Sequence, residues 1–242
     1  MNPFWVRHAL LPTAVLGLAC ALMAWTGADL WLADRLFDPV AAAFPLRDAF
    51  WTQTMLHYRG AKLVVAVGLG AILLWAAAFR WARLRPLQRR AGYVALCFAL
   101  GPGLVGLGKQ YSNVDCPWDL QRYGGDRPYV GLLADRPDEL PAGHCFPAGH
   151  SSGAFAFFAF YFVLRGSRPR AARAALLGVV ALGLAFAGTQ WLRGAHFPSH
   201  DLWSAWICWM TCLSLYAACL CRTASVPSPV EPQQRTTAAT AS

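Results

Sequence analysis

Six apolar windows, each close in length to a membrane crossing, constrain the fold more than any other feature of the chain. A spanning helix needs about 20 mostly apolar residues, because the hydrocarbon core is about 30 Å thick and a helix rises about 1.5 Å per residue. The composition agrees, since 57% of the residues are hydrophobic and only 14% are charged. The sequence therefore predicts an all-α polytopic membrane protein with six transmembrane helices, in one domain over residues 1–222. The windows lie at about residues 9–27, 61–79, 91–108, 151–166, 174–192 and 202–220.

The segments outside the windows differ in composition. Residues 28–60 mix acidic and basic residues with Trp and Phe, which predicts an amphipathic interfacial helix on the outer membrane surface. Residues 109–150 form a long outer loop, and residues 223–242, rich in Pro, Ser, Thr and Ala, form a disordered cytoplasmic tail. The first window follows basic residues, as a signal peptide does, but its apolar run is long for one, so we expect it to remain as a span.

Arginine-rich loops set the expected orientation. "RWARLRPLQRR" after the second window carries five arginines, "RGSRPRAAR" after the fourth carries four, and neither contains an acid. Such loops stay in the cytoplasm, which places both termini there and the 109–150 and 193–201 segments on the other side. The net charge of +9 is explained by these loops, so we expect no nucleic-acid partner. The sequence predicts a multi-pass protein of a bacterial inner membrane with its polar segments on the periplasmic face.

Three polar clusters fall at predicted outer span ends, and their residue types suit phosphate binding. Lys109, Arg122 and Arg193 are cations, and arginine binds phosphate oxygens bidentately. Backbone amides at Ala148 and Gly149 would lie at the start of the fourth span, where unpaired donors favour an anion. The clusters are "GKQYSNVDCPWDLQRYGG" (108–125), "HCFPAGHSS" (144–152) and "TQWLRGAHFPSHD" (189–201).

Histidines in the last two clusters can divide the work of phosphoryl transfer. We expect His196 to be the nucleophile and His150 to protonate the leaving oxygen. His200 or Asp201 would accept the proton on the second ring nitrogen of His196 and so hold its tautomer. His57 receives no role.

The residues "GK…CP", "PAGH" and "TQWLRGAHFPSHD" resemble the three signature segments of the type 2 phosphatidic acid phosphatase superfamily, written K-x6-R-P, P-S-G-H and S-R-x5-H-x3-D. The resemblance implies a six-span enzyme that works on the outer face through a phosphohistidine, without metal or cofactor. Its signature region is residues 109–201, with Lys109, His150 and His196 at matching positions.

The chain also departs from the pattern. Arg193 could replace one missing arginine, and Arg122 or Arg127 the other; Asp201 sits one residue past the expected acid. The variant set resembles the subgroup of lipid A phosphatases and phosphotransferases of Gram-negative bacteria. The departures are Cys116 for Arg, Ala148 for Ser, Thr189 and Gln190 for Ser-Arg, and His200 for Asp.

The expected activity is that of a phosphatase or phosphotransferase on a lipid phosphate or diphosphate, with water or a second lipid as acceptor. Open alternatives are an undecaprenyl diphosphate phosphatase, an inactive family member, and a non-enzymatic transporter or metal-handling membrane protein. Cys116 and Cys145 share the outer loop and could form a disulfide in an oxidising compartment. We expect membrane lipids as surroundings and leave the oligomeric state open.

Overall fold

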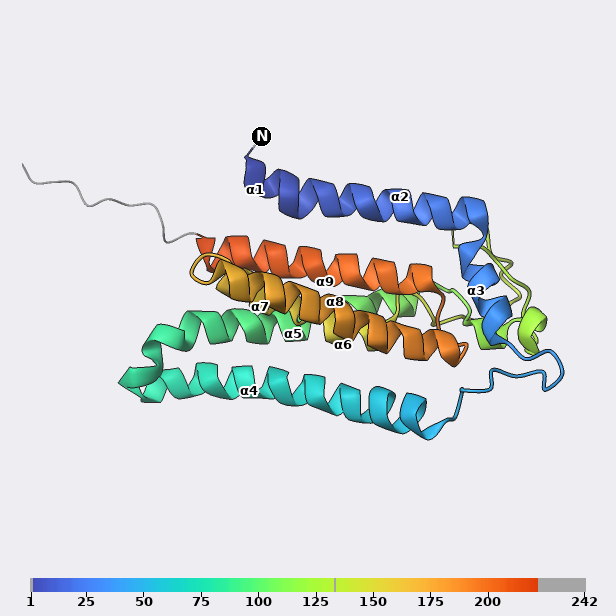
Figure 1. The fold of residues 1–242 in the computed structure, drawn as a ribbon, viewed down its shortest axis with the longest axis horizontal. Coiled ribbons are helices and arrows are strands. Elements are labelled where there is room, and N and C mark those ends of the chain that lie inside the picture. Colours follow the sequence, from blue (N-terminus) through green and yellow to red (C-terminus); the bar gives the residue numbers. More distant parts are fainter. Residues whose placement is uncertain (1, 133, 222–242) are drawn as a thin grey trace, which may run out of the picture.

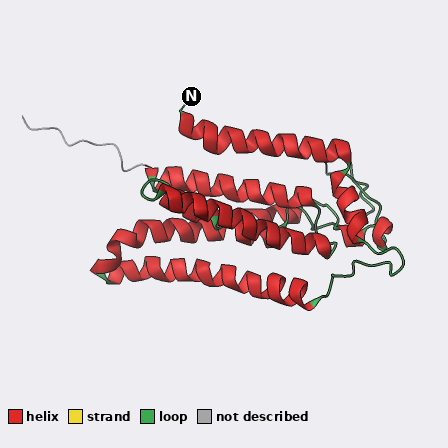
Figure 2. Cartoon of the chain, in the orientation of Figure 1, coloured by secondary structure: helices red, strands yellow, loops and turns green. Residues whose placement is uncertain are grey.

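A computed structural model describes residues 2–132 and 134–221, and most of these residues form a bundle of roughly parallel helices (Figure 1). Among them Figure 2 shows helices and loops and no strand, apart from three isolated β-bridges. The all-α prediction is therefore confirmed. The predicted tail at 223–242 lies outside the described residues.

The described residues contain nine α-helices, joined by short helical segments. The π-helical segment Val6–Leu10 joins α1 to α2, and a second one, Phe50–Arg59, leads into α4. The helices are α1 (Pro3–Trp5), α2 (Leu11–Thr26), α3 (Ala28–Leu36), α4 (Gly60–Arg80), α5 (Arg85–Tyr111), α6 (Gly149–Phe155), α7 (Phe158–Leu164), α8 (Pro169–Leu192) and α9 (Pro198–Cys219).

Five continuous helical stretches of the described chain are long and apolar enough to cross a membrane, so the chain is a multi-pass membrane protein. The fourth predicted span is shorter: its helical stretch covers only Gly149–Leu164 and is interrupted between α6 and α7. At about 1.5 Å per residue it reaches about 24 Å, less than the hydrocarbon thickness. The five are Pro3–Thr26, Phe50–Arg80, Ala82–Tyr111, Pro169–Leu192 and Pro198–Cys219.

The prediction of one interfacial helix over residues 28–60 is wrong in extent. Only α3 is helical in its first half, and it lies across the end of the bundle (Figure 1). The side chain of Asp38 accepts hydrogen bonds from the amides of Val40 and Ala41, which turns the chain just after α3. Pro45 disfavours helix at the residue before it. The second half, Phe50–Arg59, extends α4 instead.

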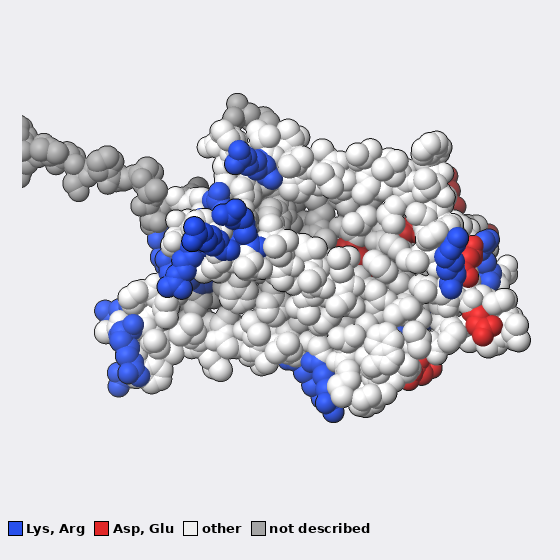
Figure 3. All heavy atoms as spheres, in the orientation of Figure 1, with Lys and Arg blue, Asp and Glu red and all other residues white. Residues whose placement is uncertain are grey.

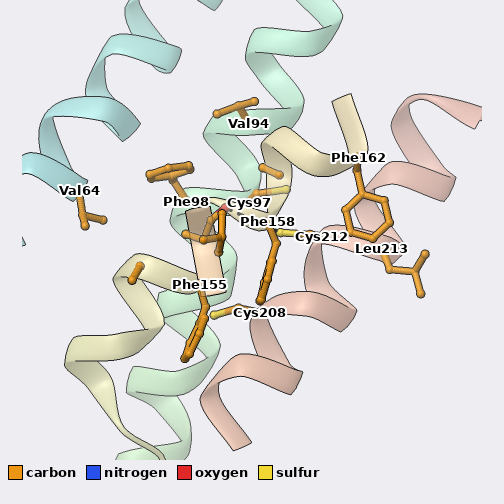
Figure 4. Packing of buried hydrophobic residues seen from close by; sticks show 14 of the residues in the cluster. Val64, Val94, Cys97, Phe98, Phe155, Phe158, Phe162, Cys208, Cys212 and Leu213 are labelled. Carbon is orange, nitrogen blue, oxygen red and sulfur yellow. Dashed lines mark hydrogen bonds between the residues drawn. The ribbon is translucent and has the colours of Figure 1, made fainter. Parts of the chain in front are cut away.

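The bundle core fixes the position of α6 and α7. Their Phe155, Phe158 and Phe162 rings pack among cysteines and aliphatic side chains of α5 and α9 (Figure 4). On the α8 side, a Cβ at Gly183 would lie 2.1 Å from the Phe155 ring, so only glycine permits this close approach. Buried cysteines act here as small apolar residues, as on α9 with Cys208.

The charged side chains are unevenly distributed along the bundle. Figure 3 shows most of the Lys and Arg at the end where α4 meets α5 and α7 meets α8, while Asp and Glu appear toward the opposite end, where further Lys and Arg lie beside them. Between the two ends, the face shown carries few charged side chains, among them a basic patch at its lower edge. Both arginine-rich loops therefore lie at one end, as a common membrane side for them requires.

Candidate active site

His196 lies in the tight turn between α8 and α9, with its side chain buried. The turn depends on Gly194, which has a φ of +68° and whose Cβ would stand 2.3 Å from the Phe44 ring. The amide of Gly194 donates to the carbonyl of Trp191, and that of Ala195 to Gln190, which closes the end of α8. The turn then points His196 inward before α9 begins at Pro198.

A disulfide packs against the His196 ring. Cys116 and Cys145 are joined, as the sequence left open, and Nδ1 of His196 lies 3.5 Å from Sγ of Cys145. The amide of Cys145 donates to the carbonyl of Val114 at 2.9 Å. The bridge and this bond tie the segment after α5 to the segment before α6, so both motifs hold one side of His196.

Burial favours the neutral imidazole form of His196. It lowers the pKa of His196 well below 6.5, and the charges of Lys109 and His200 lower it further, against a hydrogen bond with the Cys145 backbone. An unprotonated ring nitrogen carries the free electron pair that a nucleophile needs. Burial also lowers the pKa of Arg193, but a guanidinium remains charged at neutral pH.

Lys109, in the last turn of α5, reaches the first turn of α6. A Cβ built on Gly149 would lie 3.7 Å from Nζ of Lys109, so the glycine leaves room for the ammonium group. The neighbouring amide of Ala148 is already used, because it donates to the carbonyl of His200 at 3.2 Å. The structure thus leaves Gly149, and not Ala148, as an available backbone donor beside Lys109.

The start of α6 is also clamped by α9. The hydroxyl of Ser204 donates to the carbonyl of Ala148 at 2.8 Å, and the amide of Ala148 bonds to His200. The His200 ring is buried, with its centroid 5.9 Å from that of His196. His200 therefore joins the α9 turn to α6 through its backbone.

His150 occupies the first turn of α6. Its ring stacks on Phe186 of α8, with centroids 4.5 Å apart and planes 9° apart. Its Nε2 atom is buried and has no hydrogen-bond partner in the described chain. A buried nitrogen of this kind is available to a ligand.

Arg193 faces the same region from the end of α8, and sequence reasoning missed its neighbour His57. Nε of Arg193 donates to the carbonyl of Arg47 at 2.8 Å, and Nη1 to Oε1 of Gln190 at 3.2 Å. Nε2 of Gln190 lies 3.4 Å from Nδ1 of His57, whose ring centroid is 4.5 Å from that of His150. His57 precedes α4, far from the motifs; its position at the outer end of a span was the available signal.

Three other expected residues have partners elsewhere. Oδ2 of Asp201 accepts from Nε1 of Trp191 at 2.7 Å. Arg122, with 54% of its side chain exposed, forms a bidentate pair with Asp34 of α3. Arg127 pairs with Asp115, which also binds Arg136. Both candidates for the second missing arginine thus have carboxylates as partners.

The donor set does not suit a metal. Cys145, His196 and His200 could offer ligand atoms within 4.8 Å of one another. The sulfur of Cys145 is in a disulfide, however, and the thiolate is the form that binds metals. The two remaining imidazoles are fewer than the three protein ligands of ordinary zinc sites.

An apolar groove of about 350 Å³ leads to His150 between α4, α5 and α6. Val64 and Leu69 of α4 line one wall, and Phe98 and Pro102 of α5 line the other. Gly149 and His150 lie at the groove's polar limit. A chain of methylene groups could therefore occupy the groove while a polar group contacts His150.

Comparison with known proteins places this site in a family. The sequence model of the PAP2 superfamily matches residues 90–222, which include Lys109, His150, Arg193 and His196. No curated protein and no solved structure matches the chain. Members of the superfamily are generally phosphatases or phosphotransferases, which supports a phosphatase-type function for this membrane protein. Since the match covers more than half of the 242 residues, the chain belongs to the PAP2 superfamily.

Proposed function

We propose that this protein is a membrane lipid phosphatase or phosphotransferase that works through a phosphohistidine on His196. The observation that carries the proposal is the buried His196 ring, on which the charges of Lys109 and His150 both act, together with the apolar groove that His150 lines. A neutral imidazole is a nucleophile, and the nearby cation attracts a phosphate.

The reaction proceeds in two displacements. Nε2 of His196 attacks phosphorus, and the bond from phosphorus to the leaving oxygen breaks. His150, which takes up a proton when the phosphate anion binds beside it, gives that proton to the leaving oxygen. Water or a second lipid phosphate then attacks the phosphohistidine and returns a proton to His150, which frees His196. Nδ1 stays on the side of Cys145, so the turn and the disulfide orient the ring.

Cations offset the charge that develops during transfer. Lys109 lies against Gly149, next to His150, and its charge acts on His196, while the charge of Arg193 acts on His150. Such preorganised charges stabilise the transferring phosphoryl group without reorganising during the reaction. We leave Arg122 and Ala148 out of the proposed phosphate site, because Arg122 is paired with Asp34 and the amide of Ala148 donates to the carbonyl of His200.

The groove favours a lipid substrate. It is lined almost entirely by apolar side chains of α4 and α5, and Gly149 and His150 of α6 complete its lining. A lipid could place its phosphate at His150 and an acyl or prenyl chain along Val64 and Phe98. The arginine-rich loops lie at the opposite end, which by the positive-inside rule supports a site on the periplasmic side of a bacterial inner membrane.

Proteoliposomes test the proposal with three substrates, lipid A, undecaprenyl diphosphate and phosphatidic acid, each with and without a lipid diphosphate donor. We expect wild-type protein to release or transfer phosphate from at least one of them, and His196→Ala to abolish this. If the His150→Ala variant retains a radiolabelled phosphate that acid removes, this covalent label would identify the phosphohistidine. Equal activity of His196→Ala and wild-type protein on all three lipids would refute the mechanism.

A further inference from the structure

We propose that His57 is a third histidine of the active site and donates a hydrogen bond from Nε2–H to an oxygen of the bound phosphoryl group. The inference rests on the proposed function and adds a residue from outside the matched region 90–222. It comes from the Phe50–Arg59 segment, which the three sequence clusters do not include.

The placement of His57 is the first argument. Its half-buried ring lies against His150, with centroids 4.5 Å apart and planes at 43°. The segment is anchored at its start, because the buried hydroxyl of Thr52 donates to the carbonyls of Leu46 and Ala49. A group that reaches His150 therefore stands beside His57 as well.

A chain of hydrogen bonds sets the tautomer of His57. Arg193 can only donate, so the Gln190 oxygen that it contacts is correctly placed as the acceptor. The amide nitrogen of Gln190 then faces Nδ1 of His57, and an amide nitrogen donates but does not accept. Nδ1 must accept, which leaves the hydrogen of a neutral imidazole on Nε2.

The charges around His57 favour this neutral donor. Arg193 and Lys109 both act on the ring, and a second positive charge between them would be repelled. His150 and Tyr58 are the other titratable groups whose rings touch it. A neutral N–H donor adds a hydrogen bond to the phosphate without adding to this repulsion.

Two conservative variants separate binding from a purely structural role. His57→Asn keeps an acceptor near the position of Nδ1, and so the contact with Gln190, but removes the Nε2 donor. His57→Gln places an amide donor near the position of Nε2. Met55→Ala, an exposed residue of the same segment, controls for disturbance of the segment itself.

Orthovanadate, a phosphate analogue, is the probe, with binding read from the shift in melting temperature and from inhibition of lipid turnover. We expect His57→Asn to weaken orthovanadate about tenfold and to raise KM for the lipid similarly, because one hydrogen bond to a charged group is lost. His57→Gln and Met55→Ala should stay within about threefold of wild type. Inhibition by inorganic phosphate, a product, should weaken to the same extent in His57→Asn if the hydrogen bond is to the phosphoryl group and not to the lipid.

Each outcome decides the inference. Unchanged orthovanadate binding by His57→Asn, or equal loss in both variants, would overturn the role of His57, and so would a wild-type protein that binds no orthovanadate. If His196→Ala abolishes turnover while His57→Asn binds orthovanadate like wild type, the role of His57 is rejected and the phosphohistidine mechanism is retained. Wild-type orthovanadate affinity in His57→Gln but not in His57→Asn would support it even if His196→Ala retained activity.

Discussion

Removing the Cys116–Cys145 disulfide should destabilise the protein by an amount that the structure bounds. The bridge closes a loop with a sequence separation of 29, which in the chain-entropy model corresponds to about 3.6 kcal/mol at 25 °C. This is an upper bound, because helices retained in the membrane already restrain both ends of the loop in the unfolded state. We expect a loss of about 2–3 kcal/mol and a melting temperature lower by about 5–10 °C.

The assay compares apparent melting temperatures in detergent at one fixed scan rate. Cys116→Ser, Cys145→Ser and the double variant should give the same shift, since each removes the same bond. Reduction of wild-type protein should reproduce it, and reduction of the double variant should add nothing. Cys221→Ser, at an exposed free cysteine, is the matched control and should not change the melting temperature.

The same variants should lose activity, because the Cys145 sulfur lies against the His196 ring. Freeing that side of the ring by about 1 Å can cost about 100-fold in rate, so kcat of Cys116→Ser should fall by about 10- to 100-fold. Non-reducing mass spectrometry that finds both thiols free in protein isolated from cells would refute the reasoning. A melting temperature equal to that of wild type in all three variants would do the same.

Three further outcomes follow from the geometry. Arg193→Gln should lower kcat/KM by about 100-fold or more in the lipid assay, whereas Arg122→Gln, which breaks only an exposed ion pair, should change it by less than about threefold; the reverse order would contradict the assigned site. Because the neutral form of His196 reacts and burial depresses its pKa, the acid limb of kcat/KM should lie below pH 6.5, and a limb above that pH would argue against a buried nucleophile. Gly183→Val should cost at least about 1–3 kcal/mol by overpacking against a phenylalanine ring, read as a lower melting temperature, while Gly178→Ala, which has open space around it, should not.

The spans were predictable because hydrophobicity is a local property of about 20 residues. The common location of the motif residues was also predictable. Lys109, His150 and His196 all fall at the ends of predicted spans, and the orientation of the arginine-rich loops puts these ends on the same side of the membrane. The break between α6 and α7 was not, because the apolar run of the sequence continues through it.

Partners distant in sequence account for the rest. Arg122 was grouped with phosphate-binding cations, yet it meets a carboxylate 88 residues earlier on α3, which no local pattern reveals. His57 meets Gln190 across 133 residues and carries no motif of its own. In both cases the sequence shows the type of the residue but not its partner. Charge alone therefore grouped Arg122 with the phosphate-binding cations and left His57 without a role.

The two missing arginines of the superfamily pattern have different substitutes here. Cys116 takes a covalent partner, Cys145, and so supports His196 by position and not by charge. Gln190 is 2% exposed and contacts both Arg193 and His57. Its side chain therefore connects the Arg193 guanidinium by hydrogen bonds to the neutral donor His57. A third buried cation beside Arg193 and Lys109 would carry a desolvation cost and like-charge repulsion until a phosphate arrived. The Cys116–Cys145 disulfide and the hydrogen bonds from Arg193 through Gln190 to His57 avoid that cost and still present donors to the phosphate. We therefore expect the departures from the pattern to be compatible with activity.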